Sequence, residues 1–205
     1  MKLLIINQQQ SVFIDGNSLT QKDGTNADLK YRMPLTLFST LRTNSKIFAG
    51  QYYGVSGKRT SQLITDFPTK IAPYLKPNDI VVLWEITNDI GSGGVTAQQA
   101  YDNVVTYVNL VRALSAKCVV VGFIARDFAG DAADIMTRGF NCNALLAANP
   151  SVYDGFVNVG TDAAFDTRAD ASNTTYYTTD KIHLSNVGYD LIATLIEPAI
   201  RALIR

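Results

Sequence analysis

Histidine, glutamate and cysteine are scarce in this sequence. Of its 205 residues, one is a histidine, two are glutamates (Glu85 and Glu197) and two are cysteines (Cys118 and Cys142). A single histidine excludes a metal site built from several imidazole ligands. Two cysteines cannot form a disulfide framework or a four-cysteine zinc site, and the apolar run that follows Cys118 predicts a buried free thiol there.

The sequence also lacks an excess of charge and a long apolar run. Lys+Arg and Asp+Glu number 18 each, so the formal net charge is zero. Without a basic field, neither nucleic acid nor a membrane is expected as a partner. No apolar stretch approaches the roughly 20 residues of a membrane span, and the apolar run at 3–6 is too short for the core of a signal peptide. These features predict a soluble protein without an export signal in the chain as given, either cytoplasmic or part of a larger assembly.

What the sequence does contain is an alternation of short β-branched runs with helical patterns. Hydrophobic residues make up 47% of the chain and charged residues 18%, which excludes disorder and suits a single domain spanning residues 1–205. Strands are predicted at 12–15, 46–53, 80–84, 118–124 and 155–159. Helices are predicted at 27–41, at 60–75, from 97 after a Thr96–Gln99 capping box, at 132–148 and after Ser185. The alternation predicts an α/β fold with a parallel sheet covered on both faces.

Small polar segments follow the first three predicted strands, where such folds place their sites. Gly16 allows a tight turn that can expose Ser18 as a nucleophile, although Ser18 could equally be an ordinary helix cap. After the second strand, Gly57 stands near a helix start and its N–H can point at an anion. After the third, the Asn88 amide can donate to a developing oxyanion or serve only as a turn residue.

His183 is the only histidine that could act as a general base. Asp180 stands three residues before it, a spacing that lets the carboxylate accept from Nδ1 and leave Nε2 free. The alternative is a capping or core histidine without a chemical role. Together, the four polar segments supply a nucleophile, backbone and amide donors and an Asp/His pair, which are the roles that acyl transfer needs.

The same four segments, in order, resemble the sequence blocks of the SGNH (GDSL-type) hydrolases, a family of esterases. The Gly-Asp-Ser-Leu block appears at residues 16–19 with one change, and the glycine of the second block resembles Gly57. The third block, Gly-x-Asn-Asp, appears at residues 86–89, again with one change. The last block, Asp-x-x-His, is matched in full at residues 180–183. The resemblance covers the chain from about residue 11 onward.

This resemblance implies a three-layer α/β/α sandwich around a five-stranded parallel sheet, the flavodoxin-like SGNH hydrolase fold. It implies hydrolysis through an acyl-enzyme, with Ser18 as nucleophile, His183 as base and Asp180 as the carboxylate that orients the base. The implied oxyanion donors are the backbone N–H groups of Ser18 and Gly57 and the side-chain amide of Asn88. The mechanism requires no cofactor and no metal.

Two residues depart from the family's blocks. Asn17 replaces the first-block Asp, which preserves the turn preference but removes a carboxylate beside the nucleophile. Ile86 replaces the third-block Gly, and a β-branched side chain there needs a negative φ and more room. We expect both residues, together with their neighbours Trp84 and Glu85, to be candidates for substrate contact.

The substrate is predicted to be small. No insertion is long enough for a lid domain, which favours short-chain acyl esters, including acetyl groups on carbohydrate. The expected partner is therefore a small-molecule or carbohydrate ester. Two alternatives use the same fold: a non-catalytic ligand- or carbohydrate-binding domain, and a structural module of a larger assembly. Tyr53, Arg59 and Arg126 lie near strand ends, and the sequence assigns them no role.

Overall fold

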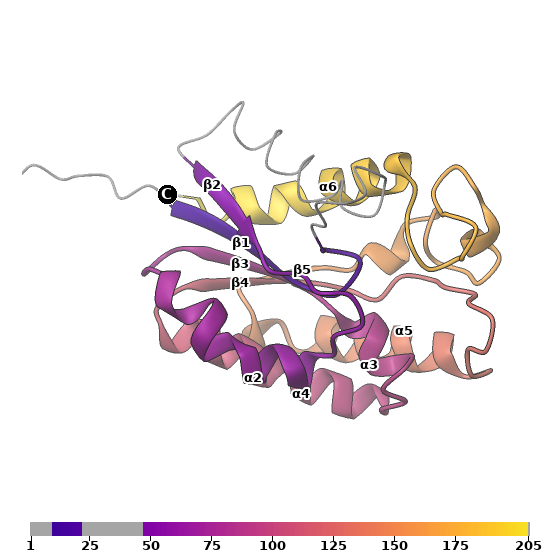
Figure 1. Ribbon diagram of the computed structural model, residues 1–205, viewed down its shortest axis with the longest axis horizontal. Coiled ribbons are helices and arrows are strands. Elements are labelled where there is room, and N and C mark those ends of the chain that lie inside the picture. The colour runs from indigo at the N-terminus through magenta and orange to yellow at the C-terminus, as the bar shows by residue number, and fades with distance from the viewer. Residues whose placement is uncertain (1–9, 22–46, 205) are drawn as a thin grey trace, which may run out of the picture.

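A computed structural model describes residues 10–21 and 47–204 of the chain. Its centre is a parallel sheet of five strands in the order β2-β1-β3-β4-β5 (Figure 1). The strands are β1 (Gln10–Gly16), β2 (Ile47–Tyr52), β3 (Ile80–Trp84), β4 (Lys117–Val121) and β5 (Gly155–Val157). The predicted α/β fold with a five-stranded parallel sheet is thereby confirmed. The helix predicted at 27–41 lies outside the described residues.

The central strands are buried on both faces of the sheet, which explains their unbroken apolar sequences. All five residues of β3 are buried. In β1, Val12 and Ile14 belong to the hydrophobic cluster on one face, and Phe13 belongs to the cluster on the other. Burying each such side chain stabilises the fold by about 1.5–3 kcal/mol. The sheet contributes side chains to both hydrophobic clusters and therefore stabilises both layers.

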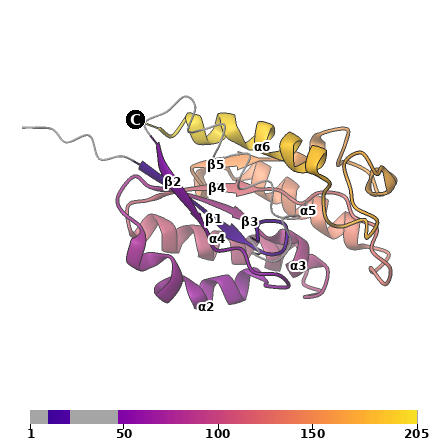
Figure 2. The ribbon, with the colours of Figure 1, turned by 45° about the horizontal axis from the view of Figure 1, so that its top comes forward.

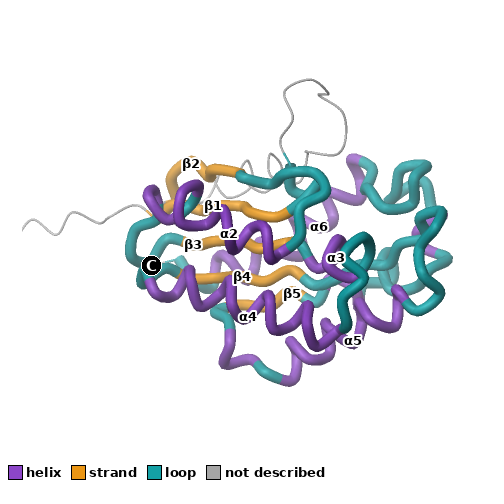
Figure 3. Tube along the Cα trace, turned by 60° about the horizontal axis from the view of Figure 1, so that its bottom comes forward, coloured by secondary structure: helices purple, strands orange, loops and turns teal. Residues whose placement is uncertain are grey.

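Helices cover each face of the sheet. One face packs against α2 (Thr60–Lys70), α3 (Ile86–Ile90), α4 (Ala97–Ala113) and α5 (Ile135–Ala148), which lie in front of the sheet in Figure 3. The other face packs against α6 (Asn186–Arg201) and against side chains from 159–184, at the top of Figure 2. Short 3₁₀ helices occur at Ala72–Tyr74, Pro150–Val152, Val159–Thr161 and Asp170–Ser172. The layers form the α/β/α sandwich that the resemblance implied.

Side-chain caps fix where two of the helices begin. The Gln99 N–H donates to Thr96 Oγ1 (3.2 Å), and the Thr96 N–H donates to Gln99 Oε1 (2.9 Å), so the predicted capping box at the start of α4 is confirmed. The Gly188 N–H donates to Ser185 Oγ (3.2 Å) at the start of α6. That second cap places α6 directly after the segment that carries His183.

Four elements end earlier than the sequence predicts: β2 ends at Tyr52 instead of 53, β5 ends at Val157 instead of 159, and α2 and β4 differ more. α2 ends at Lys70 instead of 75 and passes into a 3₁₀ helix that contains Pro73, a residue with no N–H to continue an α-helix. β4 ends at Val121 instead of 124. Beyond it, the Phe123 N–H donates to the side-chain oxygen of Asn143 (2.7 Å) and not to a neighbouring strand. Where β4 ends, the buried side chain of Asn143 therefore satisfies a backbone N–H group that a neighbouring strand would otherwise bind.

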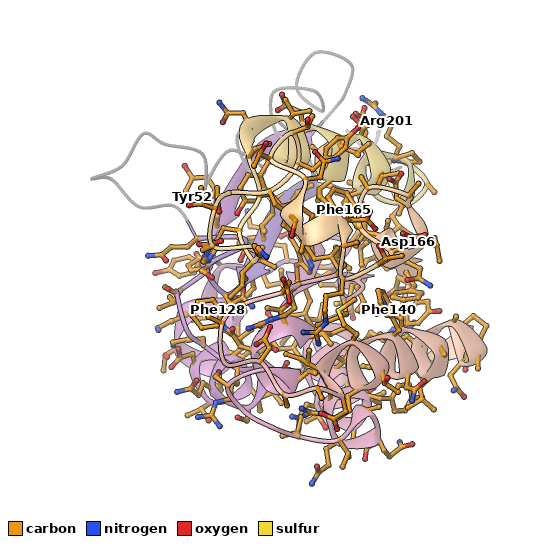
Figure 4. All side chains as sticks on the ribbon, turned by 90° about the vertical axis from the view of Figure 1, so that its right-hand side faces the viewer. Tyr52, Phe128, Phe140, Phe165, Asp166 and Arg201 are labelled. Carbon is orange, nitrogen blue, oxygen red and sulfur yellow. The ribbon has the colours of Figure 1, made fainter. Side chains whose placement is uncertain are left out.

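Because the strands are parallel, the loops that follow them meet at one edge of the sheet. Gly16 at the end of β1 is paired with Trp84 at the end of β3. A Cβ atom on Gly16 would lie 2.2 Å from the Trp84 carbonyl oxygen, so only glycine permits this approach. Figure 4 views the molecule from the side of this edge, where the loops that carry Phe128 and Phe165 lie.

Candidate active site

Three side chains that are distant in sequence form a continuous hydrogen-bonded chain at this edge. Ser18 Oγ lies 2.7 Å from His183 Nε2, and His183 Nδ1 lies 2.6 Å from Asp180 Oδ2. Ser18 is partly exposed, and the His183 side chain is 15% exposed. The structure thus brings together the serine, histidine and aspartate that the sequence singled out. In this geometry Nε2 can accept the serine proton while Nδ1–H donates to the carboxylate.

The turn that presents Ser18 is built on Asn17. The Asn17 side-chain oxygen accepts from the Leu19 N–H (2.8 Å), and its backbone carbonyl accepts from the Thr20 N–H (3.0 Å). The Asn17 amide nitrogen donates to the backbone carbonyl of Glu85 (3.2 Å). An aspartate could not make this last bond, because its carboxylate oxygens only accept. Asn17 therefore preserves the turn and adds a link to the loop after β3.

Asp180 is held as a carboxylate by four donors. Oδ1 accepts from the backbone N–H groups of Ile182 (3.0 Å) and His183 (2.9 Å) and from the Thr178 hydroxyl (2.8 Å), while Oδ2 accepts from the His183 ring. Partial burial alone would raise the pKa of Asp180. The hydrogen bonds from the His183 ring, from the two backbone N–H groups and from Thr178 outweigh it and lower the pKa well below its usual range. The carboxylate can thus stabilise a cationic imidazole in acid as well as at neutral pH.

Two candidate oxyanion donors lie next to each other across two loops. Gly57 is exposed and has φ +77°, a conformation that favours glycine. The Asn88 side-chain nitrogen donates to the carbonyl of Lys58 (2.9 Å), the residue after Gly57. This bond uses one hydrogen of the amide and leaves the other to donate. Within residues 10–21 and 47–204, the N–H groups of Ser18 and Gly57 donate to no acceptor.

Ile86 is accommodated without displacing Asn88 from this loop. Ile86 is the first residue of α3 and is buried in the cluster on the α2–α5 face of the sheet. A helical residue has the negative φ that a β-branched side chain requires. The Asn88 N–H donates to the Glu85 carbonyl (3.1 Å), and its side chain still reaches Lys58. The departure from the family's glycine therefore leaves the asparagine in place.

The four residues expected to contact substrate are buried in the protein interior. Asn17, Trp84, Glu85 and Ile86 are each at most 1% exposed, so their side chains present no surface to a substrate. Trp84 Nε1 instead donates to the carbonyl of Gly122 (3.1 Å) and joins the ends of β3 and β4. The expectation of substrate contact is corrected accordingly. These side chains lie beneath the site, where Asn17 and Glu85 link the loops after β1 and β3 to each other.

The three residues without a predicted role have structural contacts. Arg126 is 6% exposed and pairs with both carboxylate oxygens of Asp131 (2.9 and 2.7 Å), and its Nη1 donates to the Thr87 carbonyl (3.2 Å). It therefore ties the loop after β4 to the helix that carries Asn88. Tyr53 stacks on Phe13, with ring centroids 6.3 Å apart. Arg59 directly precedes α2, and its N–H donates to the side chain of the third helical residue (3.0 Å).

Sequence reasoning missed a set of buried polar contacts below the site. The Tyr107 hydroxyl donates to Asp15 Oδ2 (2.6 Å) although the two residues are 92 positions apart. The Thr60 hydroxyl donates to Glu85 Oε2 (2.7 Å), across 25 positions. No local motif marks such pairs, and the clearest sequence signal was an acidic residue beside an apolar strand. In the described ranges no cluster of three or more His, Cys, Asp or Glu side chains could hold a metal ion.

The chain was compared with protein-family models, curated proteins and solved structures. The model of the GDSL-like lipase/acylhydrolase family matches residues 16–191. A search of curated proteins finds none that matches the chain.

Several solved structures share the fold. A lipase/acylhydrolase from Enterococcus faecalis has 14% identity and a TM-score of 0.70, with 96% of this chain and 98% of that chain covered. A GDSL-like lipase from Bacteroides thetaiotaomicron has 22% identity and a TM-score of 0.66, with 95% and 89% covered. The psychrotrophic esterase EstA from Pseudoalteromonas sp., in a structure inhibited by monoethylphosphonate, has 13% identity and a TM-score of 0.68, with 95% and 98% covered.

Proposed function

We propose that this chain, which belongs to the GDSL-like lipase/acylhydrolase family, is a serine esterase that hydrolyses short-chain acyl esters through an acyl-enzyme. The observation that carries the proposal is the unbroken chain from Ser18 Oγ to His183 Nε2 (2.7 Å) and from His183 Nδ1 to Asp180 Oδ2 (2.6 Å). No other histidine exists in the sequence to take the role of base.

In the first half-reaction, Ser18 Oγ attacks the acyl carbon while His183 Nε2 takes the serine proton. The tetrahedral intermediate carries a negative oxygen, which accepts from the N–H groups of Ser18 and Gly57 and from the second amide hydrogen of Asn88. His183 then gives its proton to the leaving alcohol oxygen as the carbon–oxygen bond breaks. Asp180 stabilises the imidazolium between these two steps.

In the second half-reaction, water replaces the alcohol. His183 Nε2 takes a proton from the water, whose oxygen attacks the acyl carbon of the Ser18 ester. Collapse of the second tetrahedral intermediate returns the proton to Ser18 Oγ and releases the carboxylic acid. The same donors serve both intermediates, so one oxyanion site suffices for the complete reaction.

Small acyl groups are the proposed substrates. Gly57 is exposed, and Ser18 and His183 are partly exposed, so the reacting groups lie at the surface of the described part of the chain. Reacting groups at the surface give little apolar burial to a long acyl chain, which favours acetyl and butyryl esters. Acetyl groups on carbohydrate belong to this class and are the natural substrates that we propose to test first.

The test is hydrolysis of p-nitrophenyl acetate and p-nitrophenyl butyrate by the wild type and by Ser18→Ala, with circular dichroism on both proteins. We expect turnover that is lost in a folded Ser18→Ala protein. Equal turnover in both proteins would refute the assignment of Ser18 as nucleophile.

A phosphonate reagent gives a second readout, since the Pseudoalteromonas esterase was inhibited by one. We expect a fluorophosphonate to label the wild type at Ser18 and not to label Ser18→Ala. A folded wild type that neither turns over the esters nor reacts with the reagent would favour the non-catalytic binding domain.

A further inference from the structure

Glu85 contacts all three segments that carry the candidate oxyanion donors. Its backbone carbonyl accepts from the Asn17 side-chain amide (3.2 Å), next to Ser18, and from the Asn88 N–H (3.1 Å). Its Oε2 accepts from the hydroxyl of Thr60 (2.7 Å), the first residue of α2 and the third after Gly57. The side chain is buried, with 1% exposed. One residue thus joins the loops after β1, β2 and β3.

The other carboxyl oxygen of Glu85 has no donor. Oε1 is buried and accepts from no group in the part of the chain that the structure describes. The carboxyl group of Asp89, one helical turn further along α3, comes close to that of Glu85, because both contact Thr60: Asp89 Oδ1 accepts from its backbone N–H and Glu85 Oε2 accepts from its hydroxyl. Two ionised carboxylates in contact at a buried position repel each other strongly. A single proton shared between the two groups removes this repulsion and gives Oε1 a partner.

Counting donors assigns that proton to Glu85. Both oxygens of Asp89 already accept from N–H groups: Oδ1 from the Thr60 backbone (2.9 Å) and Oδ2 from the Asn103 side chain (3.3 Å). Since an N–H group can only donate, Asp89 is an acceptor on both sides. Glu85 Oε2 accepts from a hydroxyl, which leaves Oε1 as the atom that can carry the proton and donate it to Asp89.

We propose that Glu85 is a positioning residue, kept as a neutral carboxylic acid that donates to Asp89 and holds the three oxyanion segments together. Its effect on turnover rests on the proposed function, whereas its protonation state does not. Burial, followed by the charge of Asp89, raises the pKa of Glu85 well above its usual range, in agreement with this assignment. Ionisation of Glu85 in alkaline solution would place a second charge against Asp89, and the repulsion between the two buried carboxylates would move the start of α3, which carries Asn88.

Two other titratable or charged groups come near this carboxyl pair. Cys142 on α5 is buried, and burial followed by the charges of Asp89 and Glu85 raises its pKa to about 12, so its thiol stays neutral. Arg126 approaches the same helix at the Thr87 carbonyl, but its charge is matched by Asp131. Neither group supplies a positive charge to Glu85. Desolvation and Asp89 therefore dominate its protonation.

The scarcity of glutamate permits a direct measurement. Protein labelled with ¹³C at the side-chain carboxyl carbon of glutamate should give two NMR signals, from Glu85 and Glu197. Glu85→Gln and Glu197→Gln each remove one signal and so assign both. Glu197 forms an ion pair with Arg201 on α6 and provides the reference signal. At pH 7 we expect the Glu85 signal at the position of a protonated carboxyl group. A Glu85 signal at the ionised position at pH 7 would overturn the proposal.

Kinetics test the positioning role. For p-nitrophenyl acetate, we expect Glu85→Ala to lower kcat about 10- to 100-fold with a smaller change in KM, less than the loss of a complete oxyanion donor. Glu85→Gln should restore most of this loss, since its amide can donate to Asp89 while its oxygen accepts from Thr60. It should also abolish the alkaline fall of kcat that we expect of the wild type when Glu85 ionises. Glu197→Gln should leave both kcat and its pH profile unchanged.

The kinetic outcomes separate the possibilities. A folded Glu85→Gln protein that is as impaired as Glu85→Ala would overturn the neutral-acid role, because a charge would then be required. An unchanged alkaline fall in Glu85→Gln would assign that fall to another group and would also overturn it. If Ser18→Ala shows that the chain has no esterase activity, the NMR measurement still decides the protonation of Glu85. Failure of the proposed function and failure of this inference are thus distinguishable.

Discussion

Replacing Asn88 by alanine should separate catalysis from stability. The Asn88 amide donates one hydrogen to the Lys58 carbonyl (2.9 Å), and we assign the other to the oxyanion. Loss of the bond to Lys58, a partly exposed residue, should lower the free energy of unfolding by only about 1 kcal/mol. Loss of one of three oxyanion donors should lower kcat about 10²–10³-fold, or roughly 3–4 kcal/mol in the barrier.

The assay compares kcat for p-nitrophenyl acetate with the urea denaturation midpoint of the same proteins. Asn149→Ala is a matched control, because the Asn149 side-chain amide donates to the Leu145 carbonyl (2.8 Å) at the end of α5, where it makes the same kind of bond. Asn88→Asp is a second variant that keeps the side-chain shape but replaces the donor by an acceptor, and it should lose at least as much activity. If kcat of Asn88→Ala falls tenfold or less, or if Asn149→Ala loses as much, Asn88 does not bind the oxyanion.

Two further predictions concern buried polar groups beside the nucleophile. Burial raises the pKa of Asp15 from 3.8 to about 6, although hydrogen bonds from Tyr107 and the Gly16 N–H lower it. The folded protein therefore binds this proton at a higher pH than the unfolded chain does. As the pH rises from 3.8 to about 6, the folded protein loses about 3 kcal/mol of stability. Urea denaturation should therefore show Asp15→Asn gaining about 3 kcal/mol relative to the wild type between pH 4 and pH 7; a constant difference would contradict this. Asn17→Asp, which restores the family's residue, should cost about 1–3 kcal/mol of stability, because the bond to the Glu85 carbonyl is lost and a carboxylate is buried. A variant as stable as the wild type would show that this bond contributes nothing.

The sequence predicted the structure correctly where the residues that determine it lie close together in the chain. Gly16, Ser18 and the Asp180–His183 pair each lie within a few residues of their partners or of a strand end, so short motifs and the geometry of parallel strands suffice to predict their place. Cys118 is likewise buried as a free thiol, as its apolar neighbours indicated. The strands β1, β3 and β4 were found for the same reason, because burial on both faces gives each an apolar run.

The sequence was less informative where contacts span the fold. Residues 122–124 read as a continuation of β4, but the Phe123 N–H and carbonyl pair with the side chain of Asn143, 20 positions away. Trp84 ends a buried strand, Glu85 follows it, and both looked available to substrate, yet both are buried. Trp84 donates to Gly122, and Glu85 contacts Asn17 after β1 and Thr60 at the start of α2. In each case, the decisive partner comes from another element, and no pattern within one element records it.

The two side chains that we propose as nucleophile and base come from opposite ends of the described chain, so the proposed activity would report on folding. Ser18 follows β1, whereas His183, 165 positions later, immediately precedes α6. α6 is held by its apolar face against the sheet, through residues such as Ile192 and Ile196. When this helix separates from the sheet, His183 moves away from Ser18 although each local turn can persist. During synthesis the site therefore forms only after the segment with α6 has emerged and packed, and in the folded protein loss of turnover should coincide with amide exchange in α6.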